Sequence, residues 1–393
     1  MNDWNLLVIV VDRLNAGFLG PYGNTWVPTA AVNRLASEAW LAEFAFTTSP
    51  ALADAYRSYW RGLHPLATTT DRPALPEAWQ SAGRATVLIT DEPAIAALPE
   101  AASFAERIEV RAPAASSTNE SADQTQFAHV IGAAIERLPT LPPRFAMWLH
   151  ARGPSAAWDA PPALRDHLRD EEDPPAATLL DPPALRLPSG YDPDELVPIT
   201  QAYAAQVLAI DECLEPLFET LTEQGLAERT LVVLTSPRGY LLGQHRYVGP
   251  IADALLEDLL HVPLLVRFPD QQHAGVRETG LLEPRDLHAL LQNADDWSPP
   301  QRDRLLMVAP SERALRTSAW HLRLVGTAPT NEDAPAELYA KPDDRFEVND
   351  VAGRCQSIVS ELAAVADDTA AALGEDREAT LAPLSETLLD TFR

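Results

Sequence analysis

Lysine and cysteine are both scarce in this sequence of 393 residues. Lys341 is the single lysine among 30 basic residues, and 57 acidic residues bring the formal net charge to −27. A surface this acidic offers no general attraction to nucleic acid or to an anionic membrane face, so neither is expected as a partner. Cys213 and Cys355 are the only cysteines, which are too few for a disulfide framework.

Long apolar runs are also absent. No stretch of about 18 apolar residues occurs, so the sequence predicts no membrane span. The opening MNDWNLLVIVVD has an acid at Asp3 and only a short apolar run, without the basic region and cleavage site of a signal peptide. This pattern predicts a first core strand, and we expect a cytoplasmic location.

Short apolar runs without alternation recur through the first 300 residues, a pattern typical of strands buried on both faces. Helix-period segments lie between them, and the clearest spans 203–225 with Gly225 as its stop. Strands that alternate with helices predict an α/β fold with a mostly parallel central sheet flanked by helices. The predicted strands are 6–11, 86–90, 144–150, 230–236 and 262–268.

The pattern changes in two places. The proline-rich residues 153–198 predict a long irregular excursion over the surface. After residue 300 the sequence predicts short strands and a final helix at about 358–372. We therefore expect an α/β domain over 1–300 and a smaller C-terminal α+β domain over 301–393, with short antiparallel strands.

Four blocks of sequence occur in a fixed order along the chain. They are NLLVIVVDRLNAGFLGPYGNTWVPTAAVNRLASEA, GLAERTLVVLTSPRGYLLGQHRYVG, HVPLLVRFPD and ELYAKPDDRFEVNDVA. In order and spacing they resemble the sulfatase branch of the alkaline-phosphatase-like superfamily. The resemblance implies an alkaline-phosphatase-like fold, and for active members it implies hydrolysis of sulfuric esters.

The metal-binding positions of the family are changed in this sequence. The family holds a divalent cation with two adjacent aspartates after the first strand and an Asp-His or Asp-Asn pair after a later one. The matching pairs here are Asp12-Arg13 and Pro237-Arg238. Hard cations need several oxygen ligands, and a single carboxylate remains. We therefore expect no metal and no cofactor.

The nucleophile position is changed as well. The family motif S-P-x-C-x-P-S-R aligns with residues 49–56, which places Leu52 where a Cys or Ser is converted to formylglycine. Leucine has no oxygen or sulfur to activate. Asp54 and Tyr56 replace the proline and arginine that direct the conversion.

Further positions of the family site depart in the same direction. Asp91 stands at the sulfate-binding lysine, Ser155 at the histidine of a D-P-H motif, and Pro250 at a second lysine. An acid at the lysine position disfavours a sulfate. We expect no catalytic residues. The degenerate positions are Asp12, Arg13, Leu52, Asp91, Ser155, Pro237 and Arg238.

The leading hypothesis is a pseudoenzyme with a scaffold, regulatory or anion-binding role. In one interpretation Asp12 pairs internally with Arg13 or Arg238, which replaces the charge of a metal. In the other, basic side chains at the carboxyl ends of the strands bind a small carboxylate, phosphate or sulfate. These ligand-binding candidates are Arg13, Arg57, Arg238 and His245. A protein partner is the further possibility.

Two alternatives stay open. One is a divergent, metal-independent hydrolase of sulfuric or phosphoric esters, with Ser49 or Asp54 positioned beside a base such as His245. The other is a structural subunit whose cleft is filled by bulky side chains, namely Leu52, Tyr56 and Tyr240.

Three further residues receive structural interpretations. His150 ends a buried strand and is expected to be a core histidine, while Cys213 beside an apolar helix stripe is expected to be a packed thiol. Asp211, in the same helix, is expected to serve as a cap or in an ion pair.

Overall fold

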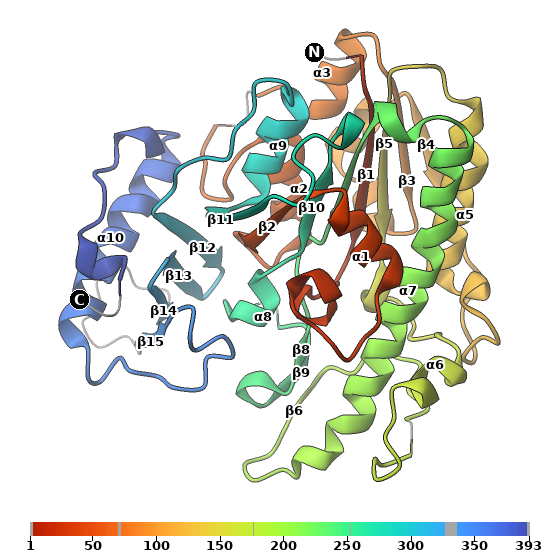
Figure 1. Cartoon of the computed structure of the whole chain (residues 1–393). Helices are drawn as coiled ribbons and strands as arrows, with labels where there is room; N and C mark the ends of the chain where they lie inside the picture. The colour runs from red at the N-terminus through yellow and green to blue at the C-terminus, as the bar shows by residue number, and fades with distance from the viewer. Residues whose placement is uncertain (1–2, 70–71, 176, 252, 327–335, 391–393) are drawn as a thin grey trace. The chain divides into compact units, whose positions relative to one another are not determined.

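The computed structural model describes residues 3–69, 72–175, 177–251, 253–326 and 336–390 (Figure 1). The chain divides into two compact units, each assembled from separate segments. The first unit comprises Met1–Glu43, Ala74–Pro250 and Val262–Glu278, and the second comprises Phe44–Pro73, Ile251–His261 and Thr279–Arg393. The expected domain division at residue 300 stays a prediction.

A large mostly parallel sheet forms the centre of the first unit, which confirms the predicted fold class. Strand β1 pairs in parallel with β5 and β7, and β3 pairs in parallel with β5 and β4. Strand β10 runs antiparallel to both β7 and β2. The order is β11-β2-β10-β7-β1-β5-β3-β4. The bounds are β1 Asn5–Val11, β2 Trp40–Ala45, β3 Ala85–Thr90, β4 Glu106–Glu109, β5 Phe145–Ala151, β7 Thr230–Thr235, β10 Leu264–Arg267 and β11 Arg277–Leu282.

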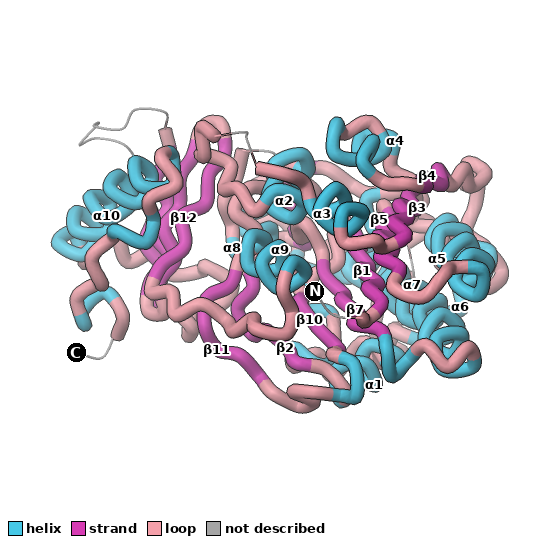
Figure 2. The backbone as a smooth tube through the Cα atoms, turned by 90° about the horizontal axis from the view of Figure 1, so that it is seen from above, coloured by secondary structure: helices cyan, strands magenta, loops and turns pink. Residues whose placement is uncertain are grey.

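Helices cover this sheet on both faces. Figure 2 shows α5 and α7 on one face and α3 on the other. Every residue of β1, β5 and β7 is buried, as the runs without alternation predicted. The helices of this unit are α1 Ala30–Ser37, α3 Leu75–Ser81, α4 Pro93–Ala96, α5 Gln126–Arg137, α6 Pro162–His167 and α7 Val197–Glu223.

Helix α7 packs against α1, α5 and α6 in the first unit. Gly225 has a φ of +64, and the N–H of Leu226 donates to the carbonyl of Leu221, so the predicted stop closes the helix in the usual way. Asp211 caps α1, because its carboxylate accepts the N–H groups of Ala31 at 3.0 Å and Val32 at 2.8 Å. The cap expected for Asp211 is confirmed.

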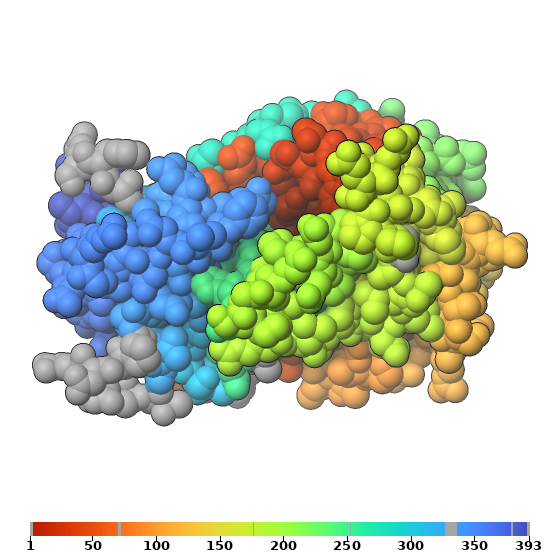
Figure 3. Space-filling view, turned by 90° about the horizontal axis from the view of Figure 1, so that it is seen from below, coloured from red at the N-terminus to blue at the C-terminus, as the bar shows by residue number. Residues whose placement is uncertain are grey.

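The excursion over 153–198 contains α6, the short strand β6 and two 3₁₀ helices, and it ends in the first residues of α7. Seen from below, its residues form much of the exposed surface of the first unit (Figure 3). Strand β6 (Leu185–Arg186) pairs with β9 (Tyr247–Gly249), and β9 pairs with β8 (Leu241–Leu242).

The second unit contains an antiparallel sheet and the final helix, as predicted. The sheet order is β12-β13-β14-β15, and α10 packs apolar side chains such as Leu362 against Leu315 and Leu322. The bounds are β12 Arg304–Ala309, β13 Glu312–Thr317, β14 Trp320–Val325, β15 Ala336–Ala340, α2 Leu52–Arg61, α8 Glu257–Leu260, α9 Pro284–Gln292 and α10 Gln356–Gly374. Within the described residues, no helix combines the length and the hydropathy that a bilayer crossing requires.

Candidate functional site

Asp12 and Arg238 meet where β1 and β7 end. Because the two strands pair in parallel, with Val10 beside Thr235, the residues that follow them emerge at the same edge of the sheet. Asp12 is 1% exposed. Arg238 donates to both oxygens of its carboxylate, with Nε at 2.9 Å and the terminal nitrogen at 2.8 Å. The internal ion pair expected for Asp12 is present in bidentate form.

Arg13 is also buried, and its side chain turns toward the backbone. Its Nε lies 4.0 Å from Asp12, and its guanidinium donates to the carbonyl of Gly239 at 2.8 Å. Its φ of +66 is in the left-handed region, which costs a residue with a Cβ roughly 1–2 kcal/mol. Hydrogen bonds on both sides hold this conformation, from Arg13 N–H to the carbonyl of Arg238 at 3.1 Å and from the Tyr203 hydroxyl to the Arg13 carbonyl at 2.6 Å.

Burial and the two arginines together set the charges of this group. Burial alone would raise the pKa of Asp12, but the hydrogen bonds and charge of Arg238, aided by Arg13, lower it below its ordinary value. Burial lowers the pKa of Arg13 to about 10, so Arg13 stays charged at neutral pH. His150, at the end of β5, has its pKa lowered to about 4, chiefly by burial. The histidine is therefore neutral at pH 7, in agreement with a core position.

Aromatic side chains fill the space beside Arg13. Tyr240 stacks on Tyr203 with ring centroids 5.5 Å apart, and Trp158 lies 5.6 Å from Tyr240. All three rings are buried. Asn15 fixes Tyr240 through two backbone hydrogen bonds of 2.7 Å, one donated by its amide and one accepted by it. Tyr240 is therefore a buried, packed side chain, which agrees with what the structural-subunit alternative expected of this residue.

The turn after β5 comes very close to Asp12. A Cβ on Gly153 would lie 2.6 Å from the Val11 side chain and 3.0 Å from the Asp12 carbonyl, and its φ is +47. Only glycine fits there without a shift of the neighbouring strand. Ser155, in the same turn, donates its hydroxyl to the carbonyl of Arg152 at 2.8 Å. Its hydroxyl is thus used within the turn.

The remaining predicted positions of the first unit lie in turns. Pro237 is buried in the loop after β7, directly before Arg238. His245 lies between β8 and β9, is half-buried and has a φ of +51. The proline ring supplies no metal ligand, and Asp12 supplies the carboxylate at the sheet edge between β1 and β7.

Leu52 and Arg57 belong to the second unit, on α2. Leu52 is the first residue of the helix and is half-buried. Arg57 donates to three carbonyl oxygens of the loop that follows, at Pro65 (3.0 Å), Ala67 (2.5 Å) and Thr69 (3.0 Å). This guanidinium therefore fixes a loop of its own unit.

Ser49 and Asp54 lie at the start of α2. The Ser49 hydroxyl donates to the Asp54 carboxylate at 2.8 Å and accepts the N–H of Ala51 at 3.2 Å. The pair fastens the chain where it enters the helix.

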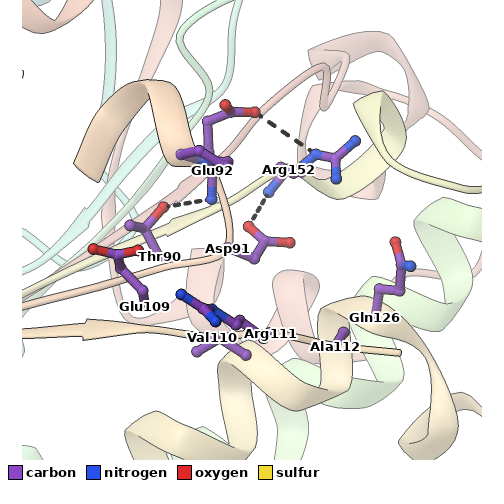
Figure 4. A pocket seen from close by; sticks show the side chains of 10 residues that line it. Thr90, Asp91, Glu92, Glu109, Val110, Arg111, Ala112, Gln126 and Arg152 are labelled. Carbon is purple, nitrogen blue, oxygen red and sulfur yellow. Dashed lines mark hydrogen bonds and ion pairs between the residues drawn. The ribbon is translucent and has the colours of Figure 1, made fainter. Parts of the chain in front are cut away.

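Another predicted position, Asp91, lines a pocket of about 380 Å³ in the first unit. The pocket lies where β3, β4 and β5 end, and its charged and polar lining includes Asp91, Glu92, Glu109, Arg111, Gln126 and Arg152 (Figure 4). The N–H of Arg152 donates to Asp91 at 2.8 Å, and burial raises the pKa of Asp91 to about 6. Sequence reasoning singled out Asp91 but missed this pocket. The charged residues directly after the neighbouring strands β3 and β5 are the sequence feature that indicates this pocket.

A separate buried cluster lies in the second unit. Among the described residues, the groups close enough to share an ion are Glu257, His321 and Glu347, whose ligand atoms lie within 4.8 Å of one another. The ammonium of Lys341 lies 2.6 Å from Glu257 and 3.4 Å from Glu347. Lysine already supplies the positive charge that these two carboxylates require.

Comparisons with known proteins agree with this fold. The structure resembles the crystal structure of a phosphonate monoester hydrolase of Agrobacterium radiobacter, with a TM-score of 0.77, 15% identity and 98% of each chain covered. The chain therefore shares the fold of that hydrolase. The Sulfatase family model matches residues 4–295, and the chain belongs to the sulfatase family.

Curated relatives align over shorter stretches. The multifunctional alkaline phosphatase superfamily protein PehA of Trinickia caryophylli is 32% identical over 97 residues, which is 24% of this chain and 18% of that protein. An N-acetylglucosamine-6-O-sulfatase of Bacteroides thetaiotaomicron is 34% identical over 73 residues, or 19% of this chain and 13% of that enzyme. The aligned parts are therefore under a fifth of either relative's length.

Proposed function

We propose that this sulfatase-family protein is a pseudoenzyme, which binds a ligand or a partner and does not hydrolyse sulfuric esters. The observation that carries the proposal is the buried bidentate pair of Asp12 and Arg238. The pair occupies the positions where the sulfatase resemblance implies metal-binding carboxylates. A guanidinium there supplies one positive charge without a metal ion.

The residues present do not fit a divalent cation. Both carboxylate oxygens of Asp12 already accept hydrogen bonds from Arg238, and Arg13 lies 4.0 Å from the same carboxylate. A +2 ion about 4 Å from one arginine would be repelled by ~8 kcal/mol at an effective dielectric constant of about 20. One carboxylate cannot offset two such terms, and Pro237 adds no donor.

The groups that would attack and position a sulfate also support the proposal. Leu52 carries a hydrocarbon side chain, and an acid, Asp91, stands at the position of the sulfate-binding lysine. Capture of a small anion by the arginines is disfavoured too. The guanidinium groups of Arg13, Arg57 and Arg238 already donate to protein oxygens.

Turnover measurements test the proposal directly. The purified chain would be assayed with aryl sulfates and aryl phosphates in the presence of Ca²⁺, Mg²⁺, Mn²⁺ or Zn²⁺ in turn. We expect no turnover above that of the heat-denatured protein. Asp12→Ala serves as the control for contamination. Turnover that the wild type shows and that Asp12→Ala loses would overturn the proposal.

A second candidate function rests on the hydrogen bond between Ser49 and Asp54. A serine hydroxyl that donates to a carboxylate at 2.8 Å is the first element of a metal-independent hydrolase. This candidate predicts turnover in the presence of EDTA, lost in both Ser49→Ala and Asp54→Asn and kept in Asp12→Ala. The same assay therefore separates the two candidates.

A further inference from the structure

We propose that the pocket at the ends of β3, β4 and β5 binds a small organic molecule through a protonated amine, with Asp91 as its counter-charge. This inference goes beyond the proposed function. It assigns a ligand class to a pocket outside the Asp12–Arg238 pair, and it holds whether or not the chain is catalytic.

The strand order builds the pocket. Strands β5, β3 and β4 are neighbours and run in parallel, so the residues after them converge at one edge of the sheet. Asp91 and Glu92 follow β3, Arg111 lies two residues after β4, and Arg152 follows β5. The volume of the pocket, about 380 Å³, lies within the ~300–1,000 Å³ typical of small-molecule sites.

Asp91 is a largely buried carboxylate without a paired cation. The backbone N–H of Arg152 donates to Oδ1, and Figure 4 shows the second oxygen directed toward the side of the pocket where Gln126 lies. Among the described residues, no arginine or lysine nitrogen forms an ion pair with it. The guanidinium of Arg152 is instead 3.6 Å from Glu92. A buried charge is stabilised by a partner of opposite sign, and here the charge of Arg152 acts on Asp91 only from a distance, without an ion pair.

A second acceptor, the amide oxygen of Gln126, lies on this side of the pocket. The side-chain N–H of Gln126 donates to the carbonyl of Pro113 at 3.0 Å, which leaves its amide oxygen as an acceptor. Figure 4 shows this oxygen on the same side as the Asp91 carboxylate. These two acceptors suit a ligand that carries hydrogen-bond donors, while the guanidinium groups of Arg111 and Arg152 line other parts of the pocket. An ammonium group offers three donors and no acceptor, together with a positive charge for a direct ion pair with Asp91.

A metal ion fits this pocket less well than an amine. Among the described residues, the pocket acids form no group of three that could share an ion. Glu92 is also engaged elsewhere, because its carboxylate accepts the N–H of Ala94 at 2.9 Å at the start of α4. Of the two other pocket carboxylates Glu109 is exposed, so the largely buried Asp91 remains, which suits one monovalent organic cation.

Calorimetric titration of the full chain at pH 8 tests the proposal. The probes are ethanolamine, 1,4-diaminobutane and lysine, with 1,4-butanediol and glutarate as counterparts that lack the amine. We expect at least one amine to bind and both counterparts not to bind. Asp91→Asn should weaken amine binding about tenfold or more, because it removes a charge-assisted hydrogen bond.

Asp91→Asn keeps the size of the side chain and its acceptor for Arg152, so the variant should fold. The matched control is Asp181→Asn, an exposed position outside the pocket, which should bind amines as the wild type does. Three results would overturn the proposal. They are no amine binding at millimolar concentration, equal affinity in Asp91→Asn, and equal affinity for 1,4-butanediol.

Discussion

Replacing Arg238 by methionine would leave the buried Asp12 without its partner. Methionine has a similar length and no charge, so the change removes both hydrogen bonds, at 2.8 and 2.9 Å, with little change in shape. Because Asp12 is 1% exposed, water cannot replace the guanidinium. Removing one partner of a buried ion pair costs about 3–5 kcal/mol. We expect a loss of that size in the free energy of unfolding at pH 8.

The size of this loss separates a buried pair from a surface pair. Arg34→Met is the matched control, because Arg34 and Glu215 form an ion pair with side chains that are 47% and 36% exposed. An exposed pair of this kind contributes about 0–1 kcal/mol. Urea unfolding would be followed by tryptophan fluorescence, to which Trp148 and Trp158, buried in the first unit, contribute.

The double variant Asp12→Asn with Arg238→Met should recover part of the loss, because it removes the buried charge as well as its partner. We expect a coupling free energy of about 2–3 kcal/mol in the double-mutant cycle. Acidification adds a second signature. In the wild type the pKa of Asp12 is lowered, so its contribution to stability is present at neutral pH and is lost as pH falls through that pKa.

In Arg238→Met the sign is reversed. Burial without the arginine raises the pKa of Asp12, so the folded state takes up a proton more readily than the unfolded state. The difference between variant and wild type should therefore shrink as the pH is lowered from 8 toward about 5. An Arg238→Met variant as stable as Arg34→Met, or a cycle without coupling, would refute the assignment of this pair as a buried internal counter-charge.

Three other predictions concern groups that the structure buries. Lys341→Met should destabilise the chain by about 3–5 kcal/mol in urea unfolding, because two buried carboxylates lose the ammonium at 2.6 and 3.4 Å. Cys213, whose pKa burial raises to about 12, should resist iodoacetamide in the native chain while Cys355 reacts first, as intact-mass measurement would show. Asp211→Ala should cost about 1–2 kcal/mol through the loss of the α1 cap, and Asp211→Asn, which keeps one acceptor, should cost less.

The central strands were predictable because they are buried on both faces. Each apolar run lacked alternation, and β1, β5 and β7 follow the predicted spans closely. The short edge strand β4, with sequence ERIE, alternates between half-buried and exposed residues and carries too little apolar signal. The antiparallel direction of β10 was not predictable either, since periodicity reports burial and not direction.

The site shows the same division. The pair of Asp12 and Arg238 followed from residue types, because a carboxylate and a guanidinium after adjacent strands have a strong electrostatic reason to meet. Arg57 was expected to be a ligand-binding candidate, and its bonds to three carbonyls depend on the path of a loop. The pocket around Asp91 depends on β5, β3 and β4 being neighbours, which is a property of strand order.

In the pseudoenzyme that we propose, the changed ligand position and the counter-charge of Asp12 are neighbours in the sequence. Pro237 and Arg238 are adjacent. The turn after β7 therefore carries a residue without a metal-ligand atom and also the guanidinium that pairs with Asp12. Arg13 alone would not pair with Asp12 in this way, because its guanidinium donates to the carbonyl of Gly239. An aspartate restored at position 13 would therefore still face Arg238 across the same carboxylate. We therefore propose that the guanidinium after β7 opposes a dication at this edge of the sheet more strongly than any single missing aspartate does.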